Sequence, residues 1–162
     1  MNCKKCAVTP GGAQTSRSRT AQPRVEHPPG RERQSELPHE GELGRLLGEE
    51  SSWVSAHRLE AAQRGAERFG CVCLLKGADT LVASPGEGVW VCALGTPALA
   101  TAGSGDVLTG IVAAFLSKRV EPRQAAAAAA AAQQLASREL PQAGAVASDV
   151  VAALPRVLDA PV

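Results

Sequence analysis

A glycine-rich segment that leads directly into an aspartate is the part of this sequence best suited to chemistry. Residues 95–110 read GTPALATAGSGDVLTG, which places Gly103 and Gly105 just before Asp106. Glycine lets backbone N–H groups approach an anion without obstruction by a Cβ atom, and a helix beginning here would add unpaired donors and partial positive charge. The segment therefore predicts a phosphate site. It is not a P-loop, because the chain has no GxxxxGK[ST] motif.

Asp106 has two possible uses at the start of such a helix. Its carboxylate can cap the first turn, or it can serve as a general base toward a hydroxyl held beside the bound phosphate. The first use is the commoner one for an isolated Gly-x-Gly-Asp, so these residues alone leave both open.

The elements that must position this segment follow from the apolar pattern, which alternates between helical and extended periods. We expect helices over residues 41–48, 53–69, 106–119, 122–140 and 148–158, and strands over residues 71–75, 80–84 and 89–93. Ser52 or Ser55 could cap the second helix and Ser148 the last, whereas Gly70 suits a helix end. This alternation predicts an α/β sheet covered by helices.

The first 35 residues differ from the rest of the 162-residue chain. They carry seven Lys or Arg against two Asp or Glu, whereas the remainder carries ten against 14. Val8 and Val25 are their only Leu, Ile, Val or Phe residues. We expect residues 1–35 to be disordered or a spurious extension, and residues 36–160 to form the folded part. The basic segment has no aromatic residue that could stack on bases, so no nucleic-acid partner is expected.

Composition also bounds the setting of the protein. No apolar run is long enough to span a membrane, and residues 1–15 lack the apolar region of a secretory signal. The five cysteines are therefore expected to be reduced thiols in a cytoplasmic protein. Cys3 and Cys6 have the spacing of half a zinc site, but without a second ligand pair no metal-ligating residues are predicted.

Three further segments accompany the glycine-rich one and together resemble a known family. Residues 100–110 resemble the signature of the ADP-dependent NAD(P)H-hydrate dehydratases, members of the ribokinase-like superfamily. Pro38-His39-Glu40-Gly41-Glu42 resembles the family's Pro-His-x-Gly-Glu motif. In the same chain order follow a Leu-Lys-Gly-Ala-x-Thr motif at residues 75–80 and the family's C-terminal end at residues 147–155. The resemblance covers residues 36 to about 158.

The resemblance implies a fold and an activity. The fold would be a ribokinase-like α/β three-layer sandwich, present only as its C-terminal half. The reaction would return hydrated NADH or NADPH (NADHX or NADPHX) to the reduced cofactor by phosphorylation of the hydrate hydroxyl and elimination of phosphate. The form of the Pro-His-x-Gly-Glu motif favours ADP, converted to AMP, over ATP, and Mg²⁺ would be required. A homo-oligomer and an NAD(P)H-hydrate epimerase as functional partner are also implied.

The resemblance further assigns roles to individual residues. Asp106 would be the catalytic base and would contact the substrate. Gly103, Ser104 and Gly105 would form an anion hole, and His39 would touch the hydrated nicotinamide. The nucleotide would be bound by Lys76, Gly77, Ala78, Asp79, Thr80 and Gly105. Taken without the resemblance, His39 could be only a turn or helix-cap residue, Lys76 a surface residue and Asp79 a turn residue.

The chain departs from the family pattern in two ways. The segments of the family's first half are absent, which would expose a central strand as a sheet edge, so weak or no activity and self-association are expected. Gln133-Gln134 stands where the family tends to have His-Gly. Two other functions therefore remain open: a ribokinase-like small-molecule kinase, or a non-catalytic nucleotide-binding fragment.

Overall fold

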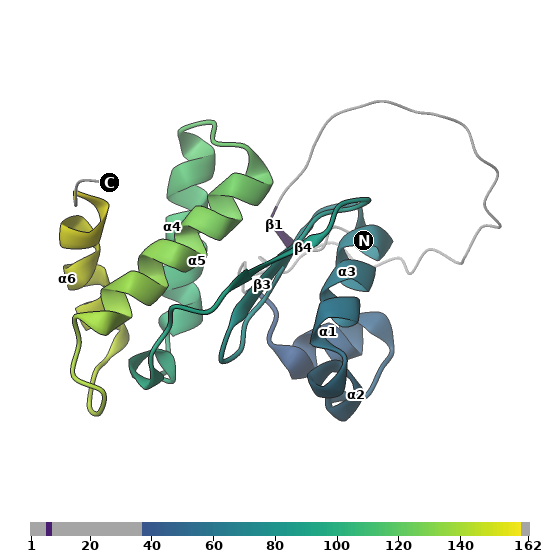
Figure 1. The fold of residues 1–162 in the computed structure, drawn as a ribbon, viewed down its shortest axis with the longest axis horizontal. Helices are drawn as coiled ribbons and strands as arrows, with labels where there is room; N and C mark the ends of the chain where they lie inside the picture. Colours follow the sequence, from purple (N-terminus) through teal and green to yellow (C-terminus); the bar gives the residue numbers. More distant parts are fainter. Residues whose placement is uncertain (1–5, 8–36, 160–162) are drawn as a thin grey trace, which may run out of the picture.

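A four-stranded antiparallel sheet lies between two groups of helices in the computed structural model, which describes residues 6–7 and 37–159 (Figure 1). The strands follow one another in chain order across the sheet. They are β1 (Cys6–Ala7), β2 (Val72–Leu75), β3 (Thr80–Ala83) and β4 (Val89–Cys92). One helical layer holds α1 (Glu40–Leu47), α2 (Ser51–Ala56) and α3 (Arg58–Phe69), and the other holds α4 (Ser104–Ser117), α5 (Pro122–Arg138) and α6 (Ala147–Leu158). The short 3₁₀-helix η1 (Pro97–Leu99) precedes α4.

The period of two in the strands builds a separate core on each face of the sheet. On β2, Cys73 and Leu75 pack against Leu43 and Val54 from the α1–α3 layer. The alternate residues Val72 and Leu74 pack with Leu108, Ala126 and Ala129 from the α4–α5 layer. The expected α/β three-layer sandwich is therefore confirmed.

The first helical layer differs from the prediction at one point. The expected helix over residues 53–69 is two helices, because His57 leaves the helical region with φ −127° and ψ 43° and divides α2 from α3. Glu50, rather than Ser52 or Ser55, occupies the N-cap position of α2. Gly70 ends α3 in the left-handed conformation, as predicted.

The second helical layer keeps close contact with the sheet through small side chains. Ala125, Ala126, Ala129 and Ala130 of the alanine tract are all buried on α5. Pro122 is the first residue of α5, as expected, and the carboxylate of Glu121 accepts hydrogen bonds from the N–H groups of residues 123 and 124. The expected cap of α6 by Ser148 is wrong: the helix begins one residue earlier, and Asp149 accepts the bond from the N–H of Val146.

The α4 helix begins two residues before its predicted start at Asp106. Gly103 adopts φ 86°, a left-handed conformation that side chains rarely accept, and this allows the helix to start at Ser104. Gly105 therefore lies in the first helical turn rather than in the preceding loop.

The segment predicted to be disordered is described at only two residues. Cys6 and Ala7 form β1 and pair antiparallel with Cys73 and Val72, so β2 has neighbours on both sides. The prediction for the rest of residues 1–35, including Cys3, lies outside the described residues. Within the described ranges, no helix is long and apolar enough to cross a membrane.

Candidate functional site

Three of the four predicted motifs converge where β2 ends. The N–H of Lys76, just after β2, donates to the carbonyl of Pro38 at 3.1 Å, which holds the Pro-His-x-Gly-Glu segment beside the Lys-Gly turn. Lys76 also reaches the first turn of α4: a Cβ atom placed on Gly105 would lie 2.5 Å from its ammonium nitrogen. Residues far apart in sequence thus surround the N-terminus of one helix.

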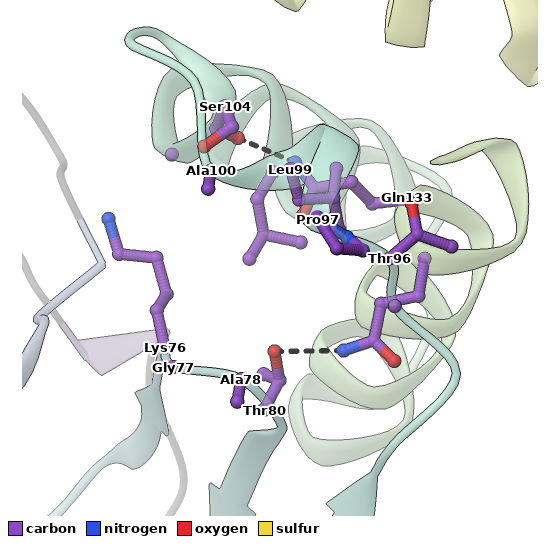
Figure 2. Close-up of a pocket in the computed structure, with 14 residues that line it drawn as sticks. Lys76, Gly77, Ala78, Thr80, Thr96, Pro97, Leu99, Ala100, Ser104 and Gln133 are labelled. Carbon is purple, nitrogen blue, oxygen red and sulfur yellow. Dashed lines mark hydrogen bonds between the residues drawn. The ribbon is translucent and has the colours of Figure 1, made fainter. Parts of the chain in front are cut away.

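A cavity of about 560 Å³ opens on one side of this junction. Lys76 and Ser104 lie at one side of it and Thr96 and Gln133 at the other, while Ala78 comes from the turn between β2 and β3 and Thr80 from the start of β3 (Figure 2). The full lining is Lys76, Gly77, Ala78, Thr80, Gly95, Thr96, Pro97, Leu99, Ala100, Ser104, Gly105, Leu108, Gln133 and Gln134. Five of the six predicted nucleotide-binding residues are therefore brought together here.

A second cavity, of about 280 Å³, lies on the other side of the same helix terminus. It brings together the predicted base and the predicted substrate contact, Asp106 and His39. Its full lining is His39, Glu42, Lys76, Thr101, Gly103, Ser104, Gly105 and Asp106. Lys76, Ser104 and Gly105 line both cavities, so a group held at the start of α4 would be reachable from either side.

Only some of the N–H groups in the predicted anion hole can donate to an anion. The N–H of Ser104 donates to the carbonyl of Thr101 at 3.3 Å, and the N–H of Asp106 donates to that of Gly103 at 3.0 Å. The N–H groups of Gly103 and Gly105 donate to no described residue. Two free donors, the helix dipole and the Lys76 ammonium together favour an anion at this point.

His39 is the N-cap of α1. Its Nδ1 accepts a hydrogen bond from the N–H of Gly41 at 3.1 Å, and Glu42 accepts one from the N–H of His39 at 3.0 Å. This confirms the helix-cap interpretation of His39. The side chain is 62% exposed and lines the smaller cavity, so contact with a substrate stays a prediction beside that structural role.

Asp79 does not line either cavity, although it belongs to the same motif as Lys76. Its carboxylate pairs with the guanidinium of Arg58 at 3.3 Å, and its carbonyl accepts a hydrogen bond from Arg58 at 2.9 Å. The same guanidinium also pairs with Glu40 on α1. Because Arg58 holds the carboxylate away from the cavity, the geometry gives no support to a nucleotide-binding role for Asp79 and supports the turn interpretation.

Two buried polar residues of α5, Gln133 and Gln134, line the larger cavity, and a third, Ser137, supports its wall. None of the three was predicted as a site residue. Gln134 accepts from the N–H of Leu94 at 2.6 Å and donates to the hydroxyl of Thr80 at 3.1 Å. Ser137 bonds Thr96, and Gln133 donates to the carbonyl of Ser104 at 2.5 Å. The sequence signals were a polar pair inside an alanine-rich helix and its departure from the family's His-Gly, and neither indicates which element these side chains face.

Cys92, on β4, is tied to the same wall of the cavity. Its thiol donates to Oε1 of Gln134 at 3.1 Å. Burial raises the pKa of this thiol above its ordinary value, an effect that the hydrogen bond from Leu94 opposes. The thiol therefore stays protonated at neutral pH and keeps its role as a donor. The thiols of Cys73 and Cys92 are free.

The described side chains contain no cluster that would hold the expected Mg²⁺ without a bound ligand. Nowhere in residues 6–7 and 37–159 do three or more His, Cys, Asp or Glu residues gather in a way that could hold a metal ion. Asp106 and Glu42 are the two carboxylates of the smaller cavity, and Mg²⁺ is usually bound by one or two carboxylates together with the phosphates of a substrate.

The sequence as a whole was compared with known proteins. A family model described as NAD(P)H-hydrate dehydratase matches residues 31–156. The bifunctional NAD(P)H-hydrate repair enzyme Nnr of Moorella thermoacetica is 43% identical over 125 residues, and the ADP-dependent (S)-NAD(P)H-hydrate dehydratase of Neisseria meningitidis is 39% identical over 115 residues. The alignments cover 75% and 71% of this chain but only 24% and 39% of those relatives, so the chain spans less than half of their length.

Solved structures agree with these matches. A crystal structure of the ADP/ATP-dependent NAD(P)H-hydrate dehydratase from Bacillus subtilis, co-crystallised with ATP/Mg²⁺, is 32% identical with a TM-score of 0.68, covering 75% of this chain and 45% of that one. A hydroxyethylthiazole kinase from Pyrococcus horikoshii, 23% identical with a TM-score of 0.55 over 72% of this chain and 45% of its own, shares the fold. Because the family model matches well over half of the sequence, this ribokinase-like chain belongs to the NAD(P)H-hydrate dehydratase family.

Proposed function

We propose that this chain carries the nucleotide-binding and catalytic part of an ADP-dependent NAD(P)H-hydrate dehydratase. The observation that carries the proposal is the shared wall of Lys76, Ser104 and Gly105 between the two cavities. A nucleotide in the larger cavity would direct its terminal phosphate to the start of α4. A hydrated nicotinamide in the smaller cavity would present its hydroxyl beside Asp106 and within reach of that phosphate.

The proposed reaction has two steps. In the first, Asp106 accepts the proton of the hydrate hydroxyl while the hydroxyl oxygen forms a bond to the β-phosphorus of ADP. The bond from that phosphorus to the bridging oxygen breaks, and AMP leaves with the electron pair. In the second step, the C–O bond breaks, phosphate leaves with its electron pair, and loss of a ring proton restores the double bond. The sum is NAD(P)HX and ADP giving NAD(P)H, AMP and phosphate.

The described residues would act on these steps mainly through electrostatics. The free N–H groups of Gly103 and Gly105 and the ammonium of Lys76 would stabilise charge on the transferred phosphoryl group. ADP is preferred over ATP on the printed name of the Neisseria relative, while the Bacillus relative is described as using either. Mg²⁺ belongs in the assay because that relative was co-crystallised with ATP/Mg²⁺, but no step above depends on it.

The test measures binding and turnover separately. Calorimetry or a thermal melt of the purified chain with ADP and with ATP reports whether the larger cavity takes the nucleotide. The appearance of reduced-nicotinamide absorbance from NADHX or NADPHX with ADP reports turnover. We expect Asp106→Asn to keep ADP affinity and to lower turnover by about 10²–10⁴-fold, the usual contribution of a general base.

The matched control is Asp159→Asn, which removes an exposed carboxylate at the end of α6 and should leave turnover unchanged. Absence of ADP binding by the unchanged chain would contradict the proposal. Binding with a stable phosphorylated product, and no regenerated NAD(P)H, would favour the small-molecule kinase. Binding with no chemistry at all would favour the non-catalytic fragment.

The proposal extends to a partner and a setting. Several relatives are named bifunctional repair enzymes, which supports a second activity acting beside the dehydratase, and we propose an NAD(P)H-hydrate epimerase. The free thiols of Cys73 and Cys92 support a reducing compartment such as the cytoplasm.

A further inference from the structure

Gln133 is a buried amide with one of its four hydrogen-bonding positions in use. The residue is only 6% exposed. Its Nε2 donates to the carbonyl of Ser104 at 2.5 Å, which ties α5 to the first turn of α4. This single bond fixes the orientation of the amide plane, because the amide nitrogen must face α4.

The carbonyl oxygen of the same amide has no partner among the described residues. The described side-chain atoms that are sealed from solvent without a partner are Oε1 of Gln63, the hydroxyl of Ser84 and Nε of Arg123. Oε1 of Gln133 is not among them, and Gln133 lines the larger cavity (Figure 2). The oxygen therefore faces that cavity as an open acceptor.

The neighbouring residue, Gln134, is a glutamine whose amide has a purely structural role. Gln134 accepts from Leu94 and Cys92 with its oxygen and donates to Thr80 and to the carbonyl of Cys92 with its nitrogen. All of its capacity is spent within the protein. Of the two glutamines, only Gln133 keeps an acceptor for a ligand. A buried polar atom normally has a hydrogen-bond partner, so the missing partner of its oxygen needs an explanation.

The chemistry of the oxygen selects what it can bind. Phosphate oxygens are acceptors and cannot bond another acceptor, so a bound diphosphate would lie at Lys76 and Gly105 instead. The donors that a purine nucleotide offers beyond its phosphates are the ribose hydroxyls and the base amine. Gln133 stands beside the phosphate end through its bond to Ser104, within the same cavity.

We propose that Oε1 of Gln133 accepts a hydrogen bond from a nucleoside hydroxyl or amine and so contributes to nucleotide selection in the larger cavity. The proposal rests on the proposed function, since it assumes that this cavity takes a nucleotide. It assigns Gln133 a direct contact with the co-substrate, in addition to its contact with α4.

The experiment is a binding matrix measured by calorimetry. The ligands are ADP, 2′-deoxy-ADP and 3′-deoxy-ADP, which each lack one ribose hydroxyl, and IDP, which lacks the adenine amine. The proteins are the unchanged chain, Gln133→Leu, and the matched control Gln124→Leu, which alters an exposed glutamine on the same helix. We expect Gln133→Leu to weaken ADP binding by about threefold to tenfold, the worth of one neutral hydrogen bond.

The pattern across ligands separates a contact from a structural effect. The analogue that lacks the bonded donor should bind the unchanged chain and Gln133→Leu equally, and its identity distinguishes a ribose hydroxyl from the base amine. An equal loss for all four ligands would overturn the proposal, as would equal binding of all four by the unchanged chain, a result independent of how the variants fold. Failure of the unchanged chain to bind ADP would instead overturn the proposed function and this inference with it.

Discussion

At the scale of single residues, Lys76 is the side chain on which most of the proposed site depends. Its ammonium lies over Gly105 and lines both cavities. No carboxylate among the described residues forms an ion pair with it. A cation without a protein counter-ion at a helix N-terminus is suited to an anionic ligand.

We therefore expect Lys76→Met to weaken ADP binding by roughly tenfold to a hundredfold, because a hydrogen bond to a charged group contributes about 1.5–3 kcal/mol. Calorimetry at low and at high salt checks this, and the difference between the two proteins should shrink as salt screens the charge. Lys118→Met is the control, since it removes an exposed ammonium at the far end of α4. Equal affinity of Lys76→Met and the unchanged chain would remove Lys76 from the site.

Individual site residues were predictable where a motif fixed both residue type and neighbours. Lys76, Gly105 and Asp106 lie where the motifs indicated. Asp79 does not, because its carboxylate pairs with Arg58, a residue 21 positions earlier in the chain. Gln133 was not predicted because its place in the site depends on a hydrogen bond to the carbonyl of Ser104, which lies on another helix. Partners of this kind depend on tertiary packing, which periodicity does not report.

At the scale of elements, the first turn of α4 links stability to binding. Gly105 lies within the helix, where glycine costs roughly 0.5–1 kcal/mol relative to alanine. Its missing Cβ leaves the space that the Lys76 ammonium occupies. A residue that weakens the helix is thus retained at the point where an anion would be bound.

For this reason Gly105→Ala and Gly110→Ala should have similar effects on stability but different effects on ADP binding. Both remove a glycine from α4, and both should raise the free energy of unfolding, by up to about 1 kcal/mol. Only Gly105→Ala should weaken ADP binding, by about tenfold (about 1.4 kcal/mol), because its Cβ displaces Lys76. A Cβ on Gly110 meets no atom within 4 Å. Denaturant unfolding and calorimetry measure the two effects, and unchanged affinity in Gly105→Ala would contradict this account.

The sequence predicted whether a segment is a helix or a strand better than it predicted where that segment begins and ends. The helix expected over residues 53–69 is broken at His57, whose ring stacks on Trp53 with centroids 4.8 Å apart. No Gly or Pro marks that break, so local signals could not indicate it. The early start of α4 likewise depends on the conformation of Gly103. Apolar runs, together with the Pro-Gly-Glu-Gly turn at residues 85–88, identified the three sheet segments 72–75, 80–83 and 89–92.

At the scale of the whole molecule, β4 is an open edge. It pairs with β3 and with no other strand in the part of the chain that the structure describes. Val91 in its middle is 55% exposed and Trp90 is 43% exposed. An apolar strand with unpaired N–H and C=O groups is a template for pairing with another copy.

We expect the purified chain to associate in a concentration-dependent way and Val91→Lys to reduce that association, because a charged side chain on an edge strand disfavours pairing. Sedimentation velocity over a range of concentrations measures it. Val151→Lys is the control, since it places the same charge at a valine that is 51% exposed on α6. An equal decrease in both variants would mean that net charge, and not the edge strand, sets the association.

The chain order of the strands also determines the sequence of events by which the site is assembled. Strands β2, β3 and β4 are consecutive, so short loop closures form the β2–β3 and β3–β4 pairings, and such local contacts form quickly. The wall contributed by α5 requires much longer closures: Gln134 bonds Thr80 across 54 residues, and Arg123 bonds Glu87 across 36. We expect β2, β3 and β4 to pair early in folding and the larger cavity to close late. A newly synthesised chain would thus become able to bind a ligand only when the rest of its fold is complete.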